Sequence, residues 1–364
     1  MYDYLVVGSG LFGSTFARIM TDAGKTCLVI DKRPHIGGNV YTEDRGGIYL
    51  HKYGPHIFHT SNDEIWDFVN QHAEFNNYIH QVKAYYNGVY YTLPFNLKTF
   101  NEIEKIRSVK QLQGMIDFWN RRYDDEDKPN LEKWAMSQVG PNVYDKLIKG
   151  YTHKQWDQDP RELPASIIRR IPIRHTFNDN YFNDKYQGIP IGGYTQMIKS
   201  MLKDVPFLVD MPFSYEFKNI AKKVVYTGPI DEFFNYELGK LEYRSLDFVH
   251  EKYDDLEYFQ GCAQINYTDR AVPHTRIIEH KHFNPESKTD FTIITKEFPT
   301  KYGEPFYPIN DEKNNKLFKK YEALAKEREP DIIFGGRLGT YKYYDMHQVI
   351  GQAMKTAKLE KGEG

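Results

Sequence analysis

The sequence predicts a mixed α/β fold in which a parallel-sheet domain is interrupted by a helical insert and by a second, antiparallel sheet. Three observations predict this class. A buried strand, a glycine-rich turn, an amphipathic helix and a second buried strand follow one another over residues 2–30. Helical periodicity with dense charge extends over residues 97–150, and polar and aromatic residues alternate over residues 240–310.

The opening segment has the spacing of a dinucleotide-binding turn. The apolar run at residues 2–7 is followed directly by the glycine motif GSGLFG at residues 8–13 and then by a helical pattern. Glycines at these positions permit a tight turn, close approach of the backbone to a pyrophosphate, and close packing of the helix against the strand. A second strand at residues 26–30 ends at Asp31, whose carboxylate can accept hydrogen bonds from ribose hydroxyls.

The next residues, KRPHIGGN at 32–39, indicate which dinucleotide is bound. A basic residue two positions after the acid, followed by paired glycines, resembles the extended fingerprint of flavoproteins of the glutathione-reductase and amine-oxidase types. In those proteins the first strand–turn–helix unit holds the ADP half of FAD. The sequence has no second GxGxxG motif after a strand and no redox cysteine pair. We therefore expect neither a separate NADPH domain nor a disulfide reductase.

Composition excludes several classes of protein. The chain has 48 Lys and Arg against 50 Asp and Glu, so it is not built as a basic nucleic-acid binder. No run approaches the roughly 18 apolar residues of a membrane span. Cys27 and Cys262 are too few for a disulfide framework or a zinc site, and a strand begins at residue 2, so we expect a cytoplasmic protein. The 29 tyrosines suit either sheet packing or a polar cavity lined by phenols.

The remaining elements follow in order along the chain. We expect a helix at 65–71, a hairpin turning at Asn87-Gly88 within 78–93, irregular structure over 163–190, a helix at 195–202, a strand at 222–230 in the first sheet, a charged helix at 314–329, a last strand at 332–334 and a helix from about Asp345. These elements predict three interleaved domains. They are a Rossmann-like FAD-binding domain (1–75, 190–235 and 328–364), a helical bundle (97–162) and an antiparallel-sheet substrate domain (76–96, 163–189 and 236–327).

Segments from end to end of the chain together resemble bacterial UDP-galactopyranose mutases. They are VVGSGLFGS (6–14), DKRPHIGGN (31–39), YGPHIFHT (53–60), GYTHKQW (150–156), LPASIIRRIPIR (163–174), NDNYF (178–182), GIPIGGYTQM (188–197), YTGPID (226–231), HTRIIEH (274–280) and GGRLGTYKYYDM (335–346). The resemblance implies interconversion of UDP-galactopyranose and UDP-galactofuranose without net redox change. It implies that N5 of reduced FAD attacks the anomeric C1 with UDP as leaving group, and that the furanose supplies cell-surface glycans.

The resemblance also implies site residues, position by position. Catalytic roles are implied for Arg170, Arg276 and His56. The implied substrate-binding residues are Tyr151, Trp156, Arg170, Tyr181, Asn266, Arg276, Tyr307 and Tyr343. The implied cofactor-binding residues are Gly8, Gly10, Leu11, Phe12, Gly13, Asp31, Lys32, Arg33, Gly38, Asn39, His56, Ile57, Gly336, Arg337, Tyr343, Asp345 and Met346. Arginine suits the diphosphate because its planar fork binds phosphate oxygens bidentately. The segment 167–179 is the implied mobile lid and carries Arg170, with Arg169 and Arg174 flanking the site.

Several alternatives stay open. A flavin oxidoreductase of the amine-oxidase type, or a FAD-stabilised binding protein, would share the FAD fingerprint. UDP-N-acetylgalactosamine is a possible second substrate, and a residue such as His59 or Arg169 would decide its acceptance. His56 and His59 form a weak candidate metal pair, and core packing is the alternative for His59, Trp156 and Tyr307. We expect a homodimer, with the helical segment 97–150 as the contact surface.

Overall fold

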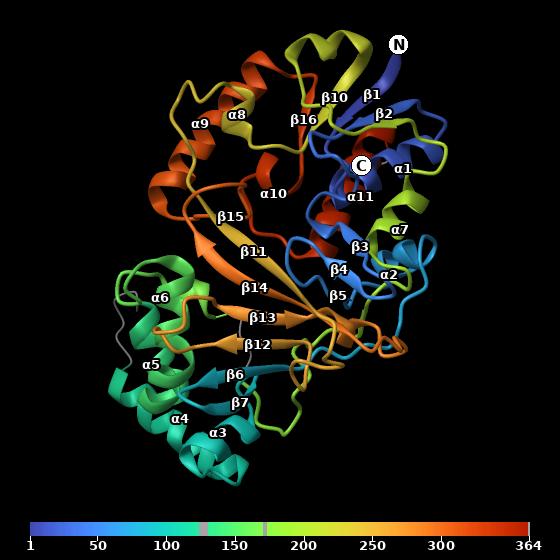
Figure 1. Ribbon diagram of the computed structural model, residues 1–364. Helices are drawn as coiled ribbons and strands as arrows, with labels where there is room; N and C mark the ends of the chain where they lie inside the picture. Colours follow the sequence, from blue (N-terminus) through green and yellow to red (C-terminus); the bar gives the residue numbers. More distant parts are fainter. Residues whose placement is uncertain (124–129, 170–172, 363–364) are drawn as a thin grey trace. The chain divides into compact units, whose positions relative to one another are not determined.

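The computed structural model describes residues 1–123, 130–169 and 173–362 (Figure 1). The described part of the chain divides into two compact units. The first unit comprises Met1–Tyr78, Asp184–Ser245 and Lys301–Gly364, and the second comprises Ile79–Asn183 and Leu246–Thr300. The predicted mixture of a Rossmann-like domain with helices and a second sheet is confirmed. The further division of the second unit into a helical domain and a sheet domain stays a prediction.

The first unit is built on a parallel sheet with strands from distant parts of the sequence. In spatial order these are β16 (Ile332–Phe334), β10 (Ala221–Tyr226), β1 (Tyr2–Val7), β2 (Cys27–Ile30) and β9 (Phe207–Leu208). Alternate residues of β1 face opposite sides, so Tyr4 and Val6 enter one buried cluster and Leu5 and Val7 enter another. The sheet is therefore covered on both faces, which explains the continuous apolar runs of its strands.

Helices and short strands surround this sheet. The helices of the first unit are α1 (Leu11–Asp22), α2 (Asp63–Asn70), α7 (Tyr194–Met201), α8 (Ile230–Phe233), α9 (Glu312–Arg328), α10 (Gly336–Gly339) and α11 (Met346–Lys361), with 3₁₀ turns at Gly38–Val40 and Tyr215–Ile220. Antiparallel pairs join β3 (Thr42–Asp44) to β4 (Tyr49–His51) and β5 (Phe58–Thr60) to β8 (Tyr186–Gly188). Figure 1 shows α11 beside α1, so the end of the chain packs on its beginning.

The second unit joins a sheet to helices. Its strands, in spatial order, are β11 (Tyr243–Tyr253, which starts in the first unit), β14 (Thr292–Thr300), β13 (Arg276–Glu279), β12 (Gln264–Tyr267), β6 (Val82–Tyr86) and β7 (Val89–Leu93). Its helices are α3 (Leu97–Glu104), α4 (Val109–Tyr123), α5 (Leu131–Val143), the π-helical turn Tyr144–Lys149, α6 (Gly150–Trp156), and 3₁₀ turns at Ala165–Ile167 and His280–Phe283. In the first unit, the short β15 (Tyr307–Pro308) pairs with the start of β11.

One pairing differs from the prediction of an antiparallel sheet. β12 pairs with β6 in parallel, with Gln264 opposite Val82 and Tyr267 opposite Tyr85. A tight hairpin turn forces an antiparallel pair, but β6 and β12 lie far apart in sequence and no such turn joins them. The predicted hairpin at Asn87-Gly88 is confirmed, and both turn residues have positive φ (47° and 82°), as a type I′ turn requires.

The helices of the second unit pack on the β6–β7 hairpin. Val82 and Ala84 from β6 share a buried cluster with Phe100, Leu131 and other apolar residues of the helices. None of the helices in the described ranges combines the length and the apolar character that crossing a membrane would need.

The contact between α1 and β1 gives the first prediction. A Cβ at Gly13 would lie 1.9 Å from the carbonyl oxygen of Gly8, so Gly13→Ala must push the helix away from the strand. We expect this variant to lose about 3 kcal/mol of unfolding free energy, together with the flavin that the sequence predicts it to bind. Denaturant titration and the flavin absorbance of the purified protein measure both effects.

Gly114→Ala is the matched control. Gly114 lies within α4, and a Cβ there would meet nothing within 4 Å. The control should be neutral or gain up to about 1 kcal/mol from higher helix propensity. A Gly13→Ala protein with the stability and flavin content of the control would contradict the assignment of this contact.

Candidate active site

The glycine turn brings three backbone segments of the first unit into direct contact. Gly8 has a φ of 104°, and a Cβ there would lie 2.0 Å from Oγ1 of Thr227. A Cβ at Gly38 would lie 3.0 Å from the Cα of Gly10, so the loop after β2 rests on the loop after β1. Side chains do not fit at these positions, and the resulting cradle is made of backbone together with the side chain of Thr227.

The N-terminus of α1 opens into this cradle. Gly10 is the N-cap, no side chain of the described residues caps the helix, and its first turn holds no acid. The N–H groups of a first helical turn have no partner within the helix, and they carry the positive end of the helix dipole. The side chains of Leu11 and Phe12 are buried in the core, so these two residues can offer a ligand only backbone groups. This arrangement fits the pyrophosphate of FAD.

Asp31 is buried at the end of β2 and holds the glycine turn together. Its carboxylate accepts from the backbone N–H of Ser9 (2.8 Å), from Oγ of Ser9 (2.6 Å) and from the N–H of Arg33 (3.0 Å). A carboxylate has about four acceptor sites, so one remains for a ribose hydroxyl. Sequence reasoning missed Ser9, whose Oγ also accepts from the N–H of Gly37 at 3.1 Å. The position of Ser9 between Gly8 and Gly10 in the glycine motif is the sequence feature that could have identified it.

The two basic residues after Asp31 share one acidic partner, and Arg33 makes further contacts. The guanidinium of Arg33 donates to Oδ1 of Asn39 (3.0 Å) and lies 4.3 Å from the ring centre of Tyr53. Arg33 and Asn39, both predicted to bind the cofactor, are therefore in contact. Lys32 forms an ion pair with Glu304 at 3.2 Å, both side chains being about half exposed, and Arg33 pairs with the same carboxylate at 3.6 Å.

A second group of predicted residues also meets in the first unit. Arg337 donates to the carbonyl oxygens of Phe306 (3.1 Å) and Tyr344 (2.6 Å). Its guanidinium carbon lies 4.9 Å from the ring centre of Tyr343 and 5.8 Å from that of Tyr307. The two tyrosine rings stack with their centres 5.6 Å apart. The structure thus places the rings of Tyr307 and Tyr343 beside the guanidinium of Arg337.

The segment around Arg337 also abuts the first turn of α1. A Cβ at Gly335 would lie 2.2 Å from Cζ of Phe12, and one at Gly336 would lie 3.5 Å from Cβ of the same side chain. The predicted helix from Asp345 is confirmed: Asp345 is the N-cap of α11 and its N–H donates to Oε1 of Gln348 (2.9 Å). Met346 is the first helical residue. Orientation of this helix toward the flavin stays a prediction.

The two predicted histidines are held differently. Nδ1 of His56 lies 2.8 Å from the carbonyl oxygen of Gly54, and since a carbonyl can only accept, this nitrogen carries the proton. Nδ1 of His59 lies 2.7 Å from Oδ2 of Asp184, which fixes the ring of His59. Ile57, between them, is buried. Within the described ranges, no group of three His, Cys, Asp or Glu could hold a metal ion.

In the second unit, the sheet places Asn266 opposite Arg276. The two residues are paired in register on β12 and β13, and Arg276 is paired in turn with Glu297 on β14. Nε of Arg276 donates to Oε2 of Glu297. Glu297 is fully buried, and this burial raises the pKa of its carboxyl group although Arg276 opposes the shift. Glu297 therefore fixes the guanidinium of Arg276 on the sheet, a role that the sequence did not reveal.

The predicted aromatic residues of the second unit lie at the edge of its core. Tyr151 and Trp156 come from α6, and both are partly buried. Trp156 and Tyr181 pack against the buried cluster of the helices. The N–H of Tyr181 donates to the carbonyl oxygen of His80 at 2.8 Å, and the two rings meet edge to face.

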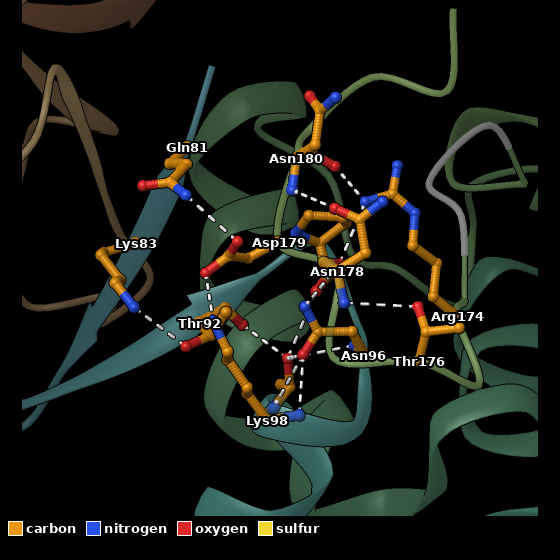
Figure 2. Close-up of polar contacts among 12 residues, drawn as sticks. Gln81, Lys83, Thr92, Asn96, Lys98, Arg174, Thr176, Asn178, Asp179 and Asn180 are labelled. Atoms are coloured by element: carbon orange, nitrogen blue, oxygen red, sulfur yellow. Dashed lines mark hydrogen bonds and ion pairs between the residues drawn. The ribbon is translucent and has the colours of Figure 1, made fainter. Parts of the chain in front are cut away.

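The predicted lid is described in part. Arg170 lies outside the described residues, whereas Arg169 has its guanidinium carbon 6.0 Å from the ring centre of Trp134. Arg174 is buried and donates to the carbonyl oxygens of Asn178 and Asn180 (Figure 2). It also donates to Oδ1 of Asn183. Arg174 thus holds the loop that carries Tyr181.

The same loop is tied to the hairpin and to α3. Asp179 accepts from Nζ of Lys98 (2.5 Å) and from the side-chain amide of Gln81 (3.1 Å), and the side-chain amide of Asn96 donates to the carbonyl oxygen of Asn178 (3.0 Å), as Figure 2 shows. This polar network anchors the downstream part of the predicted lid.

Comparison with known proteins supports one family. The family model for UDP-galactopyranose mutase matches residues 146–343, and that for an NAD(P)-binding Rossmann-like domain matches residues 6–72. The chain is 42% identical to a probable UDP-galactopyranose mutase of Klebsiella pneumoniae, over 98% of this chain and 94% of the relative. It is 37% identical to a dTDP-fucopyranose mutase of Escherichia coli, over 99% and 98% of the two chains.

Solved structures share the fold. A crystal structure of reduced UDP-galactopyranose mutase matches with a TM-score of 0.77 at 14% identity, covering 100% of this chain and 96% of the other. Putrescine oxidase matches with a TM-score of 0.59 at 13% identity, covering 100% and 99%. A full-length relative at 42% identity and a family model over residues 146–343 decide the assignment. The chain belongs to the UDP-galactopyranose mutase family, a family of FAD-dependent isomerases.

Proposed function

We propose that this protein interconverts UDP-galactopyranose and UDP-galactofuranose in the reduced state, without net oxidation of the sugar. The observation that carries the proposal is Arg276, which the sheet holds between Asn266 and the buried Glu297 in a segment matched by the family model. A guanidinium fixed in this way suits a diphosphate, because its planar fork matches the geometry of phosphate oxygens.

Reduced FAD, when bound, would supply the nucleophile, its N5, for displacement of UDP from the anomeric carbon. Arg276 binds and orients the diphosphate as the bond from the anomeric carbon to oxygen breaks. Arg170 is proposed as a second diphosphate-binding arginine, and stabilisation of the developing negative charge by positioned cations is worth several kcal/mol. Asn266 is proposed to hold the substrate beside Arg276.

Aromatic residues are proposed to bind the rest of the substrate. Tyr151 and Trp156 cover the uridine and sugar, and the hydroxyls of Tyr181, Tyr307 and Tyr343 donate to phosphate oxygens. His56, with its proton on Nδ1, offers Nε2 as an acceptor toward the flavin or substrate.

The cofactor residues have separate proposed roles. The N–H groups of α1 and the backbone of Gly8, Gly10, Gly13 and Gly38 hold the pyrophosphate, and Asp31 accepts from the ribose. Arg33, Asn39, Arg337 and Met346 are proposed to contact the remainder of the FAD.

The similarity to a dTDP-fucopyranose mutase makes a dTDP-sugar the second candidate substrate. Thymidine differs from uridine by a ring methyl and the missing 2′-hydroxyl, and fucose lacks the C6 hydroxyl of galactose. A site that hydrogen-bonds the 2′-hydroxyl and the C6 hydroxyl would strongly reject the dTDP-sugar that lacks them. A site with apolar side chains at these positions would not reject it. UDP-N-acetylgalactosamine is proposed as a further substrate to test.

We also propose a cytoplasmic homodimer that supplies furanose for cell-surface glycans. Cys27 and Cys262, both within the described residues, are free thiols, which suits a reducing compartment. On α4, Val109 and Phe118 are 47% and 49% exposed, and such side chains support a helical contact surface.

Turnover tests the proposed function directly. The dithionite-reduced protein should convert UDP-galactofuranose to UDP-galactopyranose, as followed by HPLC, with no net oxidation of the flavin by the sugar. The oxidised protein should be inactive. Faster conversion of the dTDP-fucose pair would favour the second candidate. Bleaching of the flavin by an amine, with consumption of oxygen, would instead favour an oxidoreductase.

The pair of Arg276 and Glu297 gives a further prediction. Arg276→Ala should weaken UDP binding by about 10- to 100-fold, the loss of a hydrogen-bonded charge pair. It should also lower stability by about 3–5 kcal/mol at neutral pH, because Glu297 loses its buried cation. Isothermal titration with UDP and denaturant titration measure the two effects.

The pH dependence of this stability loss has a defined sign. Burial raises the folded-state pKa of Glu297, so the loss is smallest below the unfolded pKa and grows as the pH rises through the raised folded value. Adding Glu297→Gln to Arg276→Ala should restore stability at neutral pH without restoring UDP affinity. Recovery of UDP affinity in the double variant would contradict the role of Arg276 in binding the diphosphate.

A further inference from the structure

One face of a helical stretch in the second unit packs on the turn between β12 and β13. Lys146, Gly150 and Lys154 are spaced four residues apart along the π-helical turn and α6, so they lie on the same face. The carbonyl oxygen of Lys146 accepts from Oγ1 of Thr268 at 2.7 Å. A Cβ at Gly150 would lie 2.3 Å from the carbonyl oxygen of Thr268, so the helix approaches the turn as closely as backbone allows.

The ammonium group of Lys154 completes this contact. Nζ donates to the backbone carbonyl oxygens of Tyr267 (2.6 Å), Val272 (2.8 Å) and His274 (2.9 Å). An ammonium has three donors, and here three backbone acceptors receive them. Burial lowers the pKa of Lys154 to about 8, although Asp269 opposes the shift. A lysine brought into this position despite the cost of desolvation holds the turn closed.

The two elements joined by Lys154 carry residues for two parts of the substrate. On α6, Tyr151 and Trp156 flank Lys154 in sequence, and they are the residues proposed for the uridine and sugar. The turn connects Asn266, at one side, to Arg276 at the other, and Arg276 is proposed for the diphosphate. Lys154 itself points at backbone carbonyls and not at a ligand.

We propose that Lys154 is a positioning residue for nucleotide binding, which sets the distance between the uridine-binding residues of α6 and the diphosphate-binding Arg276. This inference rests on the proposed function. The binding energy of UDP depends on both groups engaging one molecule at once, and a misplacement of about 1 Å can cost up to about 100-fold. Ligands that use one group alone do not depend on this distance.

The test compares two buried lysines of the second unit. Lys154→Met keeps an apolar stem of similar length and removes the donors. Lys281→Met is the matched control, because Lys281 is also buried and its Nζ donates to the backbone carbonyl oxygens of Glu257 (3.1 Å) and Thr289. The loops that Lys281 holds carry none of the proposed site residues.

Both variants should lose stability in denaturant titrations of the flavin-bound protein. Lys154→Met should also bind UDP about 10- to 100-fold more weakly, with a raised KM for the UDP-sugar and nearly unchanged affinity for uridine alone, measured by ligand-observed NMR. Lys281→Met should keep wild-type affinity for both. Equal UDP affinity in the two variants, or equal losses of UDP and uridine binding in Lys154→Met, would overturn the inference.

A second variant guards against misfolding of the first. Gly150→Ala leaves the donors of Lys154 in place but pushes the turn away from the helix, and it should show the same loss of UDP affinity with uridine affinity kept. If Lys154→Met does not fold, the UDP and uridine affinities of Gly150→Ala test the inference instead. A wild-type protein that binds no UDP would contradict the proposed function, and this inference with it, whereas wild-type UDP binding with both variants unaffected contradicts the inference alone.

Discussion

The cofactor-binding part of the protein depends on one constraint, the contact of backbone with backbone at the glycine turn. Because Gly13 has no side chain, α1 packs directly on the carbonyl of Gly8, and its N-terminus lies at the end of the sheet where the first two strands finish. Asp31 lies next to this turn, where it accepts hydrogen bonds from the backbone N–H and the hydroxyl of Ser9. These bonds join the loop after β1 to the end of β2. The approach of Gly38 to Gly10 belongs to the same backbone geometry.

The second unit uses a different device, in which a cation is held by neutral acceptors or by a buried acid. Arg174 and Lys154 both donate mainly to backbone carbonyl oxygens, so each organises an irregular segment that has no ladder of its own. Irregular backbone near a site must satisfy its polar groups somewhere, and a long basic side chain can serve several carbonyls from one point. The loops that carry Tyr181 and lead to Arg276 are thereby given defined shapes without adding a strand or a helix.

Local patterns predicted the parts of this structure that depend on neighbours in sequence. The glycine turn, the Asn87-Gly88 hairpin and the helix capped by Asp345 each follow from a few adjacent residues, and each is confirmed. Contacts made across long separations could not be predicted in this way. The alternation in β12 indicates a strand but not whether its partner runs parallel, and Lys154 looks like any other surface lysine of a charged helix. Resemblance to a family supplied Arg276, yet not the buried Glu297 that holds it.

The charge on Arg276 has a further consequence for the proposed reaction. A buried carboxylate beside a guanidinium fixes its orientation, but it also offsets its positive charge, so the pair presents little net charge to a diphosphate. Orientation and net attraction are therefore supplied by different groups. A second cation would draw in and stabilise a leaving group that gains charge, and Arg170, which lies outside the described residues, is the residue proposed for it. On the proposed mechanism, Arg276 would determine where the diphosphate lies, and the second arginine would contribute most of the electrostatic stabilisation as the bond to the sugar breaks.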